Sequence, residues 1–261
     1  MLGDVLLYLG IPKESASTII KETLGHAKSY SSIHDYERNV HGVLSREGLT
    51  QAFPKNLLER TQIMYSQLNP FLLEGSVLDL GCGDGNVGQL AAADGYGVTL
   101  ADVFTHPNVE KTGLPFEPFK QGQPSPFPDN SFDNTLSLYV YHHSDNPEAS
   151  LQEAIRVTRP GGRVIAMESV YGVDGSELAP EQANKARIFT GLSSEQQRMS
   201  NIFFDHFWNR VLMYSDNPDQ KINVPFNFNT PAGWKKLAKD NGATQETLVH
   251  LAMDQPTVPE Y

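Results

Sequence analysis

The amino-acid sequence predicts an α/β fold with a doubly wound, mostly parallel sheet, N-terminal helices and a helical insert. From Ser76 onward, short apolar segments alternate with segments of helical periodicity, which is typical of parallel strands joined by right-handed crossover helices. The first apolar segment leads directly into a glycine-rich loop and then a helix, as in sheets that bind a ligand at their carboxyl edge. The 261 residues are enough for one large domain of this class with a cap.

Residues 1–75 are expected to form helices, because apolar side chains recur there at helical spacing. Pro12 and Pro54 suit the first turn of a helix, since that turn does not need the amide that proline lacks. Gly25 is a candidate helix C-cap. We interpret this region as an N-terminal helical cap.

The strands of the core are expected where a short apolar segment is bounded by turn residues. One helix between them opens at Asn146-Pro147-Glu148 and ends at Arg159-Pro160-Gly161-Gly162, where proline and glycine stop it. The six expected strands are Val77–Leu80, Val98–Ala101, Phe116–Phe119, Phe132–Val140, Arg163–Ser169 and Gln245–Leu251.

Residues 172–229 interrupt the alternation of strands and helices. Ser193 and Gln196 have the spacing of a capping box, and apolar residues follow on one helical face. We expect this insert to be a helical lid that encloses the substrate. The predicted regions are a helical cap (1–75), a ligand-binding core (76–171), a helical lid insert (172–229) and a C-terminal helix and strand that complete the core (230–261).

Composition and charge indicate an ordinary soluble protein, with 39% hydrophobic and 20% charged residues. The formal net charge of −11 and the lack of a Lys/Arg cluster argue against a nucleic-acid partner. A single cysteine allows no internal disulfide, which indicates a reducing compartment. The sequence has neither a secretion signal nor a run of 18 apolar residues, so we expect a cytoplasmic protein without a membrane partner.

The glycine-rich stretch VLDLGCGDG, Val77–Gly85, raises the question of which ligand it binds. Gly81 and Gly83 fit the first two positions of the dinucleotide pattern G-x-G-x-x-G, but Asn86 occupies the third. The next glycine falls one residue early, and the Gly-Lys-Ser/Thr of a P-loop is absent. The two aspartates of the stretch are poor neighbours for a pyrophosphate. They suit a ligand that carries an ammonium or sulfonium charge.

The stretch resembles motif I of the class I S-adenosylmethionine-dependent methyltransferases. Three later landmarks extend the resemblance: Asp102 at the end of the second strand, PFPDNSFD (Pro126–Asp133) before the fourth strand, and LYVYHHSDNPEASLQEAIRVTRPGGRVIAMES. The last block is similar to the strand–helix–RVxxPGG–strand segment of the small-molecule subgroup. The resemblance covers about residues 70–170. It implies a Rossmann-like methyltransferase sheet, S-adenosyl-L-methionine as cofactor and S-adenosyl-L-homocysteine as product.

The resemblance also implies roles for the residues of the loop. Gly81, Cys82, Gly83 and Gly85 would line the methionine part and the ribose. Asp79 would order the loop and face the amino group of the cofactor, through water. We expect Cys82 to contribute its amide and its small size, because a free cysteine is usually a small buried apolar residue.

Further positions follow from the same resemblance. Asp102 would bind the ribose hydroxyls, with Val103 and Phe104 flanking the adenine. Leu138 and Tyr139, at the exit of the fourth strand, would touch the methionine end.

Gln121 and Gly122 stand where the family often has an acidic residue that holds the adenine amino group. The amide oxygen of Gln121 is able to accept the same hydrogen bond, so we include both residues in the expected cofactor site.

Two histidines follow the fourth strand and are candidate general bases. His143 is the better candidate and His142 the weaker one, with Glu168 at the end of the fifth strand weaker still. A structural role is the alternative, since one histidine at this place often only supports the loop. The His/His/Glu set has no supporting ligand spacing, so we expect no metal.

The aromatic residues of the two helical regions are candidate lid residues, either as lid core or as part of a substrate pocket. They are Tyr30, His34, Tyr36, Phe203, Phe204, His206, Phe207 and Trp208. The expected reaction is methyl transfer to an O, N or C nucleophile of a small molecule. Two alternatives stay open, namely a cofactor-binding protein that does not methylate and a methyltransferase with a protein substrate. A nicotinamide-dependent oxidoreductase is disfavoured by the glycine spacing.

The family sheet ends with a sixth strand and an antiparallel seventh strand. The tail of this chain contains Pro256 and Pro259, which makes it a poor strand. We therefore expect an incomplete or unusual edge of the sheet.

Overall fold

The computed structural model describes residues 2–25, 27–169, 187 and 189–244. Within these residues the chain forms two compact units. The first unit combines the chain up to residue 59 with the described residues between 187 and 226, and the second combines residues 60–169 with residues 227–244. Among the described helices, none has the length and apolar character needed to cross a bilayer.

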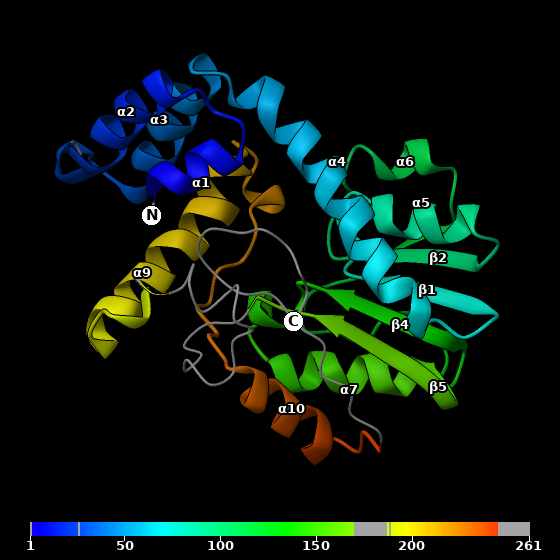
Figure 1. Cartoon of the computed structure of the whole chain (residues 1–261). Coiled ribbons are helices and arrows are strands. Elements are labelled where there is room, and N and C mark those ends of the chain that lie inside the picture. Colours follow the sequence, from blue (N-terminus) through cyan, green and yellow to red (C-terminus); the bar gives the residue numbers. More distant parts are fainter. Residues whose placement is uncertain (1, 26, 170–186, 188, 245–261) are drawn as a thin grey trace. The chain divides into compact units, whose positions relative to one another are not determined.

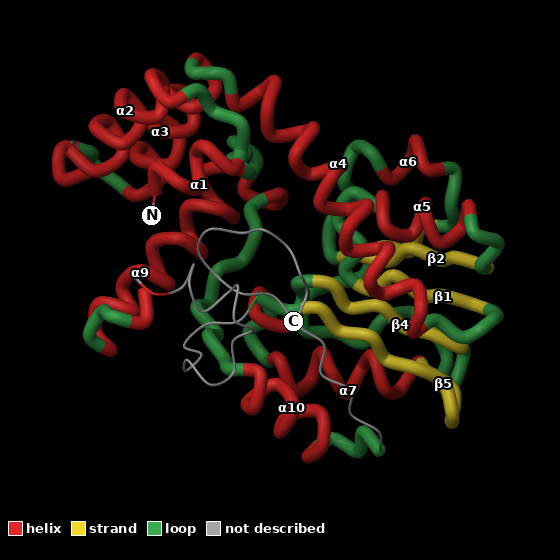
Figure 2. Tube along the Cα trace, viewed as in Figure 1, coloured by secondary structure: helices red, strands yellow, loops and turns green. Residues whose placement is uncertain are grey.

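The second unit is built on a five-stranded sheet in the order β3-β2-β1-β4-β5 (Figures 1 and 2). Every neighbouring pair of these strands is parallel. Because the order reverses between β1 and β4, the sheet is doubly wound, as predicted. The strands are β1 (Ser76–Leu80), β2 (Gly97–Asp102), β3 (Phe116–Pro118), β4 (Phe132–Leu138) and β5 (Thr158–Met167).

Helices cover both faces of this sheet. Figure 1 shows α7 and α10 on one side, with α5 and the end of α4 on the other. Asn146 caps the N-terminus of α7 by accepting a hydrogen bond from the amide of Ala149, and Thr230 caps α10 in the same way from Gly233. The helices of this unit, besides the end of α4, are α5 (Asn86–Ala93), α6 (Val109–Thr112), α7 (Pro147–Val157) and α10 (Pro231–Asp240), with the short turns η3 (Asn69–Phe71) and η4 (Tyr141–His143).

The bounds of β4 and β5 differ from the prediction by two residues or more, and β5 ends at Met167 instead of Ser169. β5 begins at Thr158 instead of Arg163, because Thr158 already pairs with Phe132 and a register shift follows. Gly161 has a φ of +82°, so the Pro-Gly-Gly segment forms an irregularity inside the strand and not a turn before it. β4 ends at Leu138, two residues before the predicted end, because the next residue has a left-handed backbone. The expected strand Gln245–Leu251 and the proline-containing tail lie outside the described residues.

The first unit is helical. Its core contains fully buried side chains from segments far apart in the sequence, such as Leu6, Ile19, Leu44 and Phe207. Its helices are α1 (Leu2–Tyr8), α2 (Lys13–Ile20), η1 (Lys21–Gly25), η2 (Ala27–Ser29), α3 (Ile33–Arg46), the first part of α4 (Leu49–Leu68), α9 (Ser194–His206), η5 (Phe207–Leu212) and η6 (Pro218–Gln220). The predicted capping box of Ser193 and Gln196 at the start of α9 is confirmed.

Three expectations for the N-terminal helices were wrong in detail. Pro54 lies inside α4, because the helix already starts at Leu49, where Gln51 and Ala52 donate to the carbonyl of Gly48. Pro12 is the N-cap residue of α2, one position before its first turn. Gly25 ends a turn of π-helix and does not cap an α-helix.

Gly88 lets α5 approach the sheet closely. A methyl group on this residue would lie 2.5 Å from Cδ2 of Leu100 and 3.2 Å from Cγ1 of Val98. Gly88→Ala is therefore expected to lower the free energy of unfolding by about 1–3 kcal/mol, because it overpacks the contact between helix and strand. Gly97→Ala is the matched control, since nothing lies within 4 Å of its Cβ position. Urea denaturation followed by circular dichroism checks the difference, and equal stability of the two variants would contradict it.

Candidate functional site

The glycine loop after β1 needs residues that adopt a left-handed backbone. Gly81, Gly83 and Gly85 have φ values of +84°, +54° and +75°. A methyl group on Gly81 would lie 2.4 Å from Cγ2 of Val140, whereas nothing lies within 4 Å of the Cβ position of Gly83. The loop is thus tightly held at its start and open at its middle.

The carboxylate of Asp102 holds this loop from the end of β2. Its Oδ2 accepts a hydrogen bond from the amide of Gly83 at 2.7 Å, and its Oδ1 accepts one from the amide of Val103 at 2.6 Å. Burial raises the pKa of Asp102, although these backbone amides act in the opposite direction. Asp102 therefore lies against the open part of the loop, where the sequence predicted a ribose contact.

Asp79, at the carboxyl end of β1, is a buried carboxylate that lacks a full set of partners. Its side chain is buried, and Oδ2 has no hydrogen-bond partner among the described residues. Burial, together with the charges of Asp102 and Asp84, raises its pKa to about 7, although the backbone amide of Gly88 acts in the opposite direction. A buried carboxylate of this kind is costly unless a positive group compensates it. These carboxylates therefore fit a cationic ligand and do not fit a phosphate.

Cys82 is buried and its thiol is not the reactive group of this site. Burial raises the pKa of the thiol, and the neighbouring carboxylates raise it further. Its amide donates to the carbonyl of Ala101 at 3.1 Å, beside the bond from the amide of Gly81 to the same oxygen. The expected contribution of its backbone and small volume to cofactor binding stays a prediction.

Asparagines complete the loop, a feature that the sequence reasoning missed. Nδ2 of Asn108 donates to the carbonyl of Asp84 at 2.9 Å and to Oδ1 of Asn86 at 3.0 Å. Asn86 in turn donates to the carboxylate of Asp84 from both its amide and its side chain. Asp84 thus closes the loop onto the N-terminus of α5. Asn86, noted only as a departure from the dinucleotide pattern, was the available signal.

The residues expected around the adenine lie at the carboxyl ends of β2 and β3. Val103 is 44% exposed, and Phe104 is half-buried. Gln121 is exposed, and its amide Nε2 is 3.4 Å from Oδ2 of Asp145. Gly122 has a φ of +73° and open space at its Cβ position. Their contact with an adenine stays a prediction.

The exit of β4 has an unusual backbone. Tyr139, which follows Leu138, has a φ of +60°, a conformation that costs energy for a residue with a side chain. Its amide donates to the carbonyl of Met167 at 2.7 Å, and the guanidinium of Arg60 lies 4.4 Å from the centre of its ring. Leu138 itself is half-buried at the end of the strand. Sequence reasoning did not find Arg60.

The two histidines after β4 occupy different surroundings. His142 is buried, and its Nδ1 lies 2.5 Å from Oε2 of Glu168, which is also buried. The other oxygen of Glu168 accepts a hydrogen bond from the amide of Tyr141 at 2.7 Å. His143 is half-buried and its ring lies 3.9 Å from the ring of His142. The arrangement therefore ties His142 into a buried support of the loop and leaves His143 the more accessible of the two.

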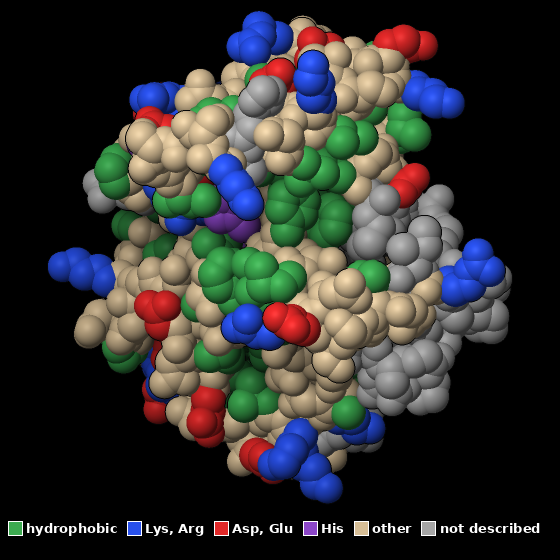
Figure 3. Space-filling model, turned by 90° about the vertical axis from the view of Figure 1, so that its left-hand side faces the viewer, with side chains coloured by type: hydrophobic (Ala, Val, Ile, Leu, Met, Phe, Trp, Pro, Cys, Tyr) green, Lys and Arg blue, Asp and Glu red, His purple; other side chains and the backbone are tan. Residues whose placement is uncertain are grey.

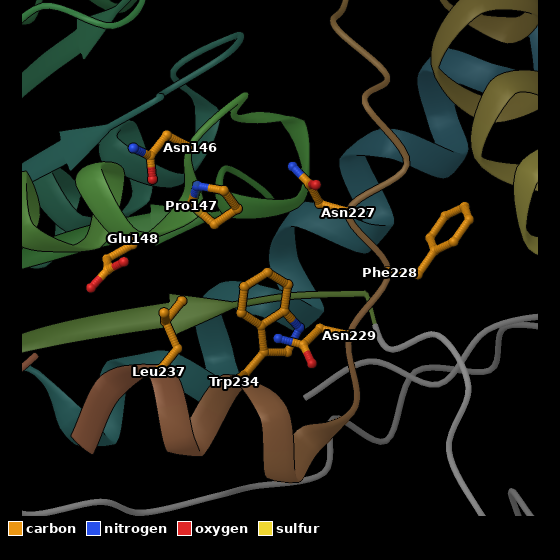
Figure 4. A pocket seen from close by; sticks show the side chains of 8 residues that line it. All are labelled: Asn146, Pro147, Glu148, Asn227, Phe228, Asn229, Trp234 and Leu237. Atoms are coloured by element: carbon orange, nitrogen blue, oxygen red, sulfur yellow. The ribbon is translucent and has the colours of Figure 1, made fainter. Parts of the chain in front are cut away.

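A pocket of about 450 Å³ lies beside the N-terminus of α7 (Figure 4). Figure 4 shows the indole of Trp234 rising from α10 toward Pro147. Trp234 also lies 6.3 Å, between ring centres, from Tyr141 of the β4 exit. Trp234 thus links the pocket to the loop that carries the two histidines. Its lining residues are Asn146, Pro147, Glu148, Asn227, Phe228, Asn229, Trp234 and Leu237.

The amides of this pocket are fixed at one end. Oδ1 of Asn146 accepts from Ala149, Nδ2 of Asn227 donates to the carbonyl of Ser144, and Oδ1 of Asn229 accepts from Thr230. The other end of each amide has no partner within the part of the chain that the structure describes. A carboxylate, Glu148, also lines the pocket. Such a lining suits a small, uncharged or cationic molecule with hydrogen-bonding groups. Within the same described residues, no group of three or more His, Cys, Asp or Glu is placed to hold a metal.

Comparison with known proteins agrees with this geometry. Residues 78–166 match a family model described as a methyltransferase domain. The demethylmenaquinone methyltransferase of Beutenbergia cavernae is 37% identical over 95 residues, which cover 35% of this chain and 40% of that protein. The corresponding enzyme of Paenarthrobacter aurescens is 35% identical over 100 residues, covering 37% of this chain and 40% of that protein. The match thus spans about two fifths of these curated relatives.

A solved structure shares the fold at low sequence identity. In the complex between the Haloferax volcanii Trm112 methyltransferase activator and the putative methyltransferase, the matched chain superposes with a TM-score of 0.51 and 17% identity. The match covers 78% of this chain and 80% of that chain. Residues 78–166 thus match the model of a methyltransferase domain, and the chain shares the fold of this solved structure.

Proposed function

We propose that this protein transfers a methyl group from S-adenosyl-L-methionine to a small-molecule acceptor. The observation that carries the proposal is the buried carboxylate of Asp79, whose Oδ2 has no partner among the described residues, beneath an open glycine loop. A ligand with an ammonium and a sulfonium group supplies the missing positive charge. The curated relatives named as demethylmenaquinone methyltransferases support the same reaction class.

The chain's own residues would bind and orient the cofactor. Asp79 compensates the positive charges, and Asp102 holds the ribose hydroxyls beside the amide of Gly83. The remaining proposed contacts are Gly81, Cys82 and Gly85 for the methionine part and ribose, Val103, Phe104, Gln121 and Gly122 for the adenine, and Leu138 and Tyr139 for the methionine end. When bound, the cofactor supplies an activated methyl group on a sulfonium. The protein then contributes mainly proximity and orientation.

The acceptor is proposed to be a small molecule because the pocket beside α7 has the size of a small-molecule site. His143 is the proposed general base for an acceptor that must lose a proton, and His142 with Glu168 would hold the loop that carries it. The helical insert is proposed to act as a lid that excludes water from the transfer.

Calorimetric titration with S-adenosylmethionine, S-adenosylhomocysteine and NADH tests the cofactor. Binding of the two adenosyl ligands and not of NADH supports the proposal, and failure of both to bind overturns it. Release of S-adenosylhomocysteine with reduced demethylmenaquinone, and with a panel of small phenols and amines, tests the transfer. Cofactor binding without product release for any small acceptor would favour a non-methylating protein or a protein substrate.

The raised pKa of Asp79 predicts how the affinity for the cofactor depends on pH. Because its pKa is raised to about 7, the carboxyl is partly protonated at neutral pH, and a cationic ligand must displace that proton. Affinity for S-adenosylmethionine is expected to rise between about pH 5.5 and 7.5, by up to about tenfold per unit well below the pKa. Calorimetry across this range measures the slope. In Asp79→Asn the slope and the affinity should both fall.

Asp79→Asn also allows the raised pKa of Asp79 to be checked in the protein without cofactor. Burying the ionised form is unfavourable, so the parent should lose stability relative to Asp79→Asn as the pH rises from about 4 to 7. Thermal unfolding of both proteins measures this. An identical pH slope for cofactor binding in parent and variant would remove Asp79 from the site.

Substitution of His142 and of His143 should have different effects on stability and turnover. His142→Ala takes the charge-assisted partner from buried Glu168 and is expected to lower the free energy of unfolding by about 1–3 kcal/mol. His143→Ala should change stability by less than about 0.5 kcal/mol and leave cofactor affinity unchanged, while product release falls. Urea denaturation, calorimetry and product assay measure the three quantities. Unchanged turnover in His143→Ala would leave this residue structural.

A further inference from the structure

The first unit contains a second cluster of charged side chains, built around one buried carboxylate. Glu37 of α3 is only 1% exposed. Its Oε1 lies 3.0 Å from Nε2 of His206 and 3.1 Å from Nη2 of Arg210, and its Oε2 lies 3.2 Å from Nζ of Lys221. Burial would raise the pKa of Glu37, but the hydrogen bond from Lys221 and the charge of Arg210 outweigh it and hold the pKa below its usual value. Glu37 is therefore an anion at neutral pH.

The basic side chains form a layer on the solvent side of Glu37. His34 is 42% exposed, Arg210 22%, Lys221 17% and His206 16%. The buried carboxylate thus lies at the base, and its partners face outward. Figure 3 shows a histidine side chain at the surface with Lys or Arg side chains beside it.

Glu37 uses only part of the hydrogen-bonding capacity of this layer. Arg210 contacts it through Nη2 alone, and its Nη1 and Nε have no partner within the described residues. Lys221 lies 2.8 Å from Nδ1 of His34. Because an ammonium only donates, Nδ1 of His34 accepts in this contact, and the ring N–H of His34 is on Nε2. Arg210, Lys221 and His34 therefore all have N–H groups left for another acceptor.

These groups are close enough for one ligand. Oε2 of Glu37 lies 3.2 Å from Nζ of Lys221 and 3.4 Å from Nη2 of Arg210, so the two cations are neighbours around the same oxygen. Aromatic rings flank the layer: Tyr214 lies 5.9 Å from the ring of His34, and Tyr36 lies 6.2 Å from that of His206.

The nearby carboxylates have partners of their own. Asp205 is buried and accepts from Asn209, Asp216 accepts from the hydroxyl of Tyr214, and Asp35 is paired with Arg38. They reduce the local charge, since the charge of Asp205 acts on His206 and that of His34 acts on Asp35. Each of the three carboxylates nevertheless has a partner outside the layer.

We propose that the basic layer over Glu37, formed by His34, His206, Arg210 and Lys221, binds the oxyanion group of a small molecule. A carboxylate and a phosphate share the required chemistry, since both accept hydrogen bonds from guanidinium and ammonium groups at short range. The planar Arg210 favours a bidentate contact, and Lys221 adds a point charge.

The binding is tested on the full chain without cofactor, so that its outcome is independent of methyl transfer. Inorganic phosphate and citrate are titrated separately, at constant ionic strength held with sodium chloride, while thermal unfolding is followed. We expect a saturating rise of the melting temperature for one of the two anions, and which one identifies the group. Equal, non-saturating responses to phosphate, citrate and chloride would overturn the proposal.

Variants separate ligand binding from a purely structural ion-pair network. Arg210→Gln and Lys221→Met should each weaken the apparent anion affinity at least tenfold, whereas Arg198→Gln, an exposed arginine on α9, should change it less than twofold. Glu37→Gln removes the competing negative charge, so it should bind the anion more tightly even where it unfolds more easily. If a basic-layer variant does not fold, His34→Ala at the exposed rim provides the test instead. Loss of anion binding in Glu37→Gln, or an effect of Arg198→Gln equal to that of Arg210→Gln, would contradict the site.

Discussion

The buried carboxylate of Asp79 is the constraint on which the rest of the proposed cofactor site depends. A carboxylate removed from water needs a positive partner or enough hydrogen bonds, and one oxygen of Asp79 has neither among the described residues. Asp102, at the end of the neighbouring strand, adds a second negative group beneath the same loop. Loops that cradle phosphates present amides and cations to their ligand. The side chains beneath this loop are carboxylates instead of cations, which is why the geometry supports a sulfonium and ammonium ligand.

The sheet explains how these groups meet. β1 carries Asp79 and β2 carries Asp102, and the two strands pair in parallel, so their carboxyl ends lie together. β4 lies on the other side of β1, and its exit residue Tyr139 takes a left-handed backbone at the same edge of the sheet. β5 then supports that exit, since Glu168 directly follows it and binds both His142 and the amide of Tyr141. Sheets of this topology commonly bind ligands where the strand order reverses, and the proposed site lies at that point.

Sequence reasoning reached the sheet, the loop and the spacing of the acidic residues, because each depends on local pattern. Apolar runs and capping residues predicted β1, β2, β4 and the start of α7 to within two residues. It misplaced the start of β5, because Thr158 pairs with Phe132 across the sheet and no local signal marks that pairing. It also read Pro54 as a helix start, although Gly48 opens the helix earlier.

The rest of the site depends on contacts between distant segments, which composition and spacing do not encode. Three kinds of contact join residues more than twenty positions apart: Arg60 over Tyr139, Asn108 on the glycine loop, and Glu37 with His206, Arg210 and Lys221. The same holds for the two histidines after β4. They are adjacent in sequence, but His142 is buried against Glu168, whereas His143 is only half-buried. Roles for such residues follow from three-dimensional partners and not from residue type.

The most direct test of the central claim is a proton count. Calorimetric titration of S-adenosylmethionine at pH 7, repeated in buffers of different ionisation enthalpy, measures the protons released on binding. Because the pKa of Asp79 is raised to about 7 and a cationic ligand favours its ionised form, the parent should release a substantial fraction of one proton, and Asp79→Asn should release clearly less. Binding without proton release in the parent, or equal release in both proteins, would contradict the account.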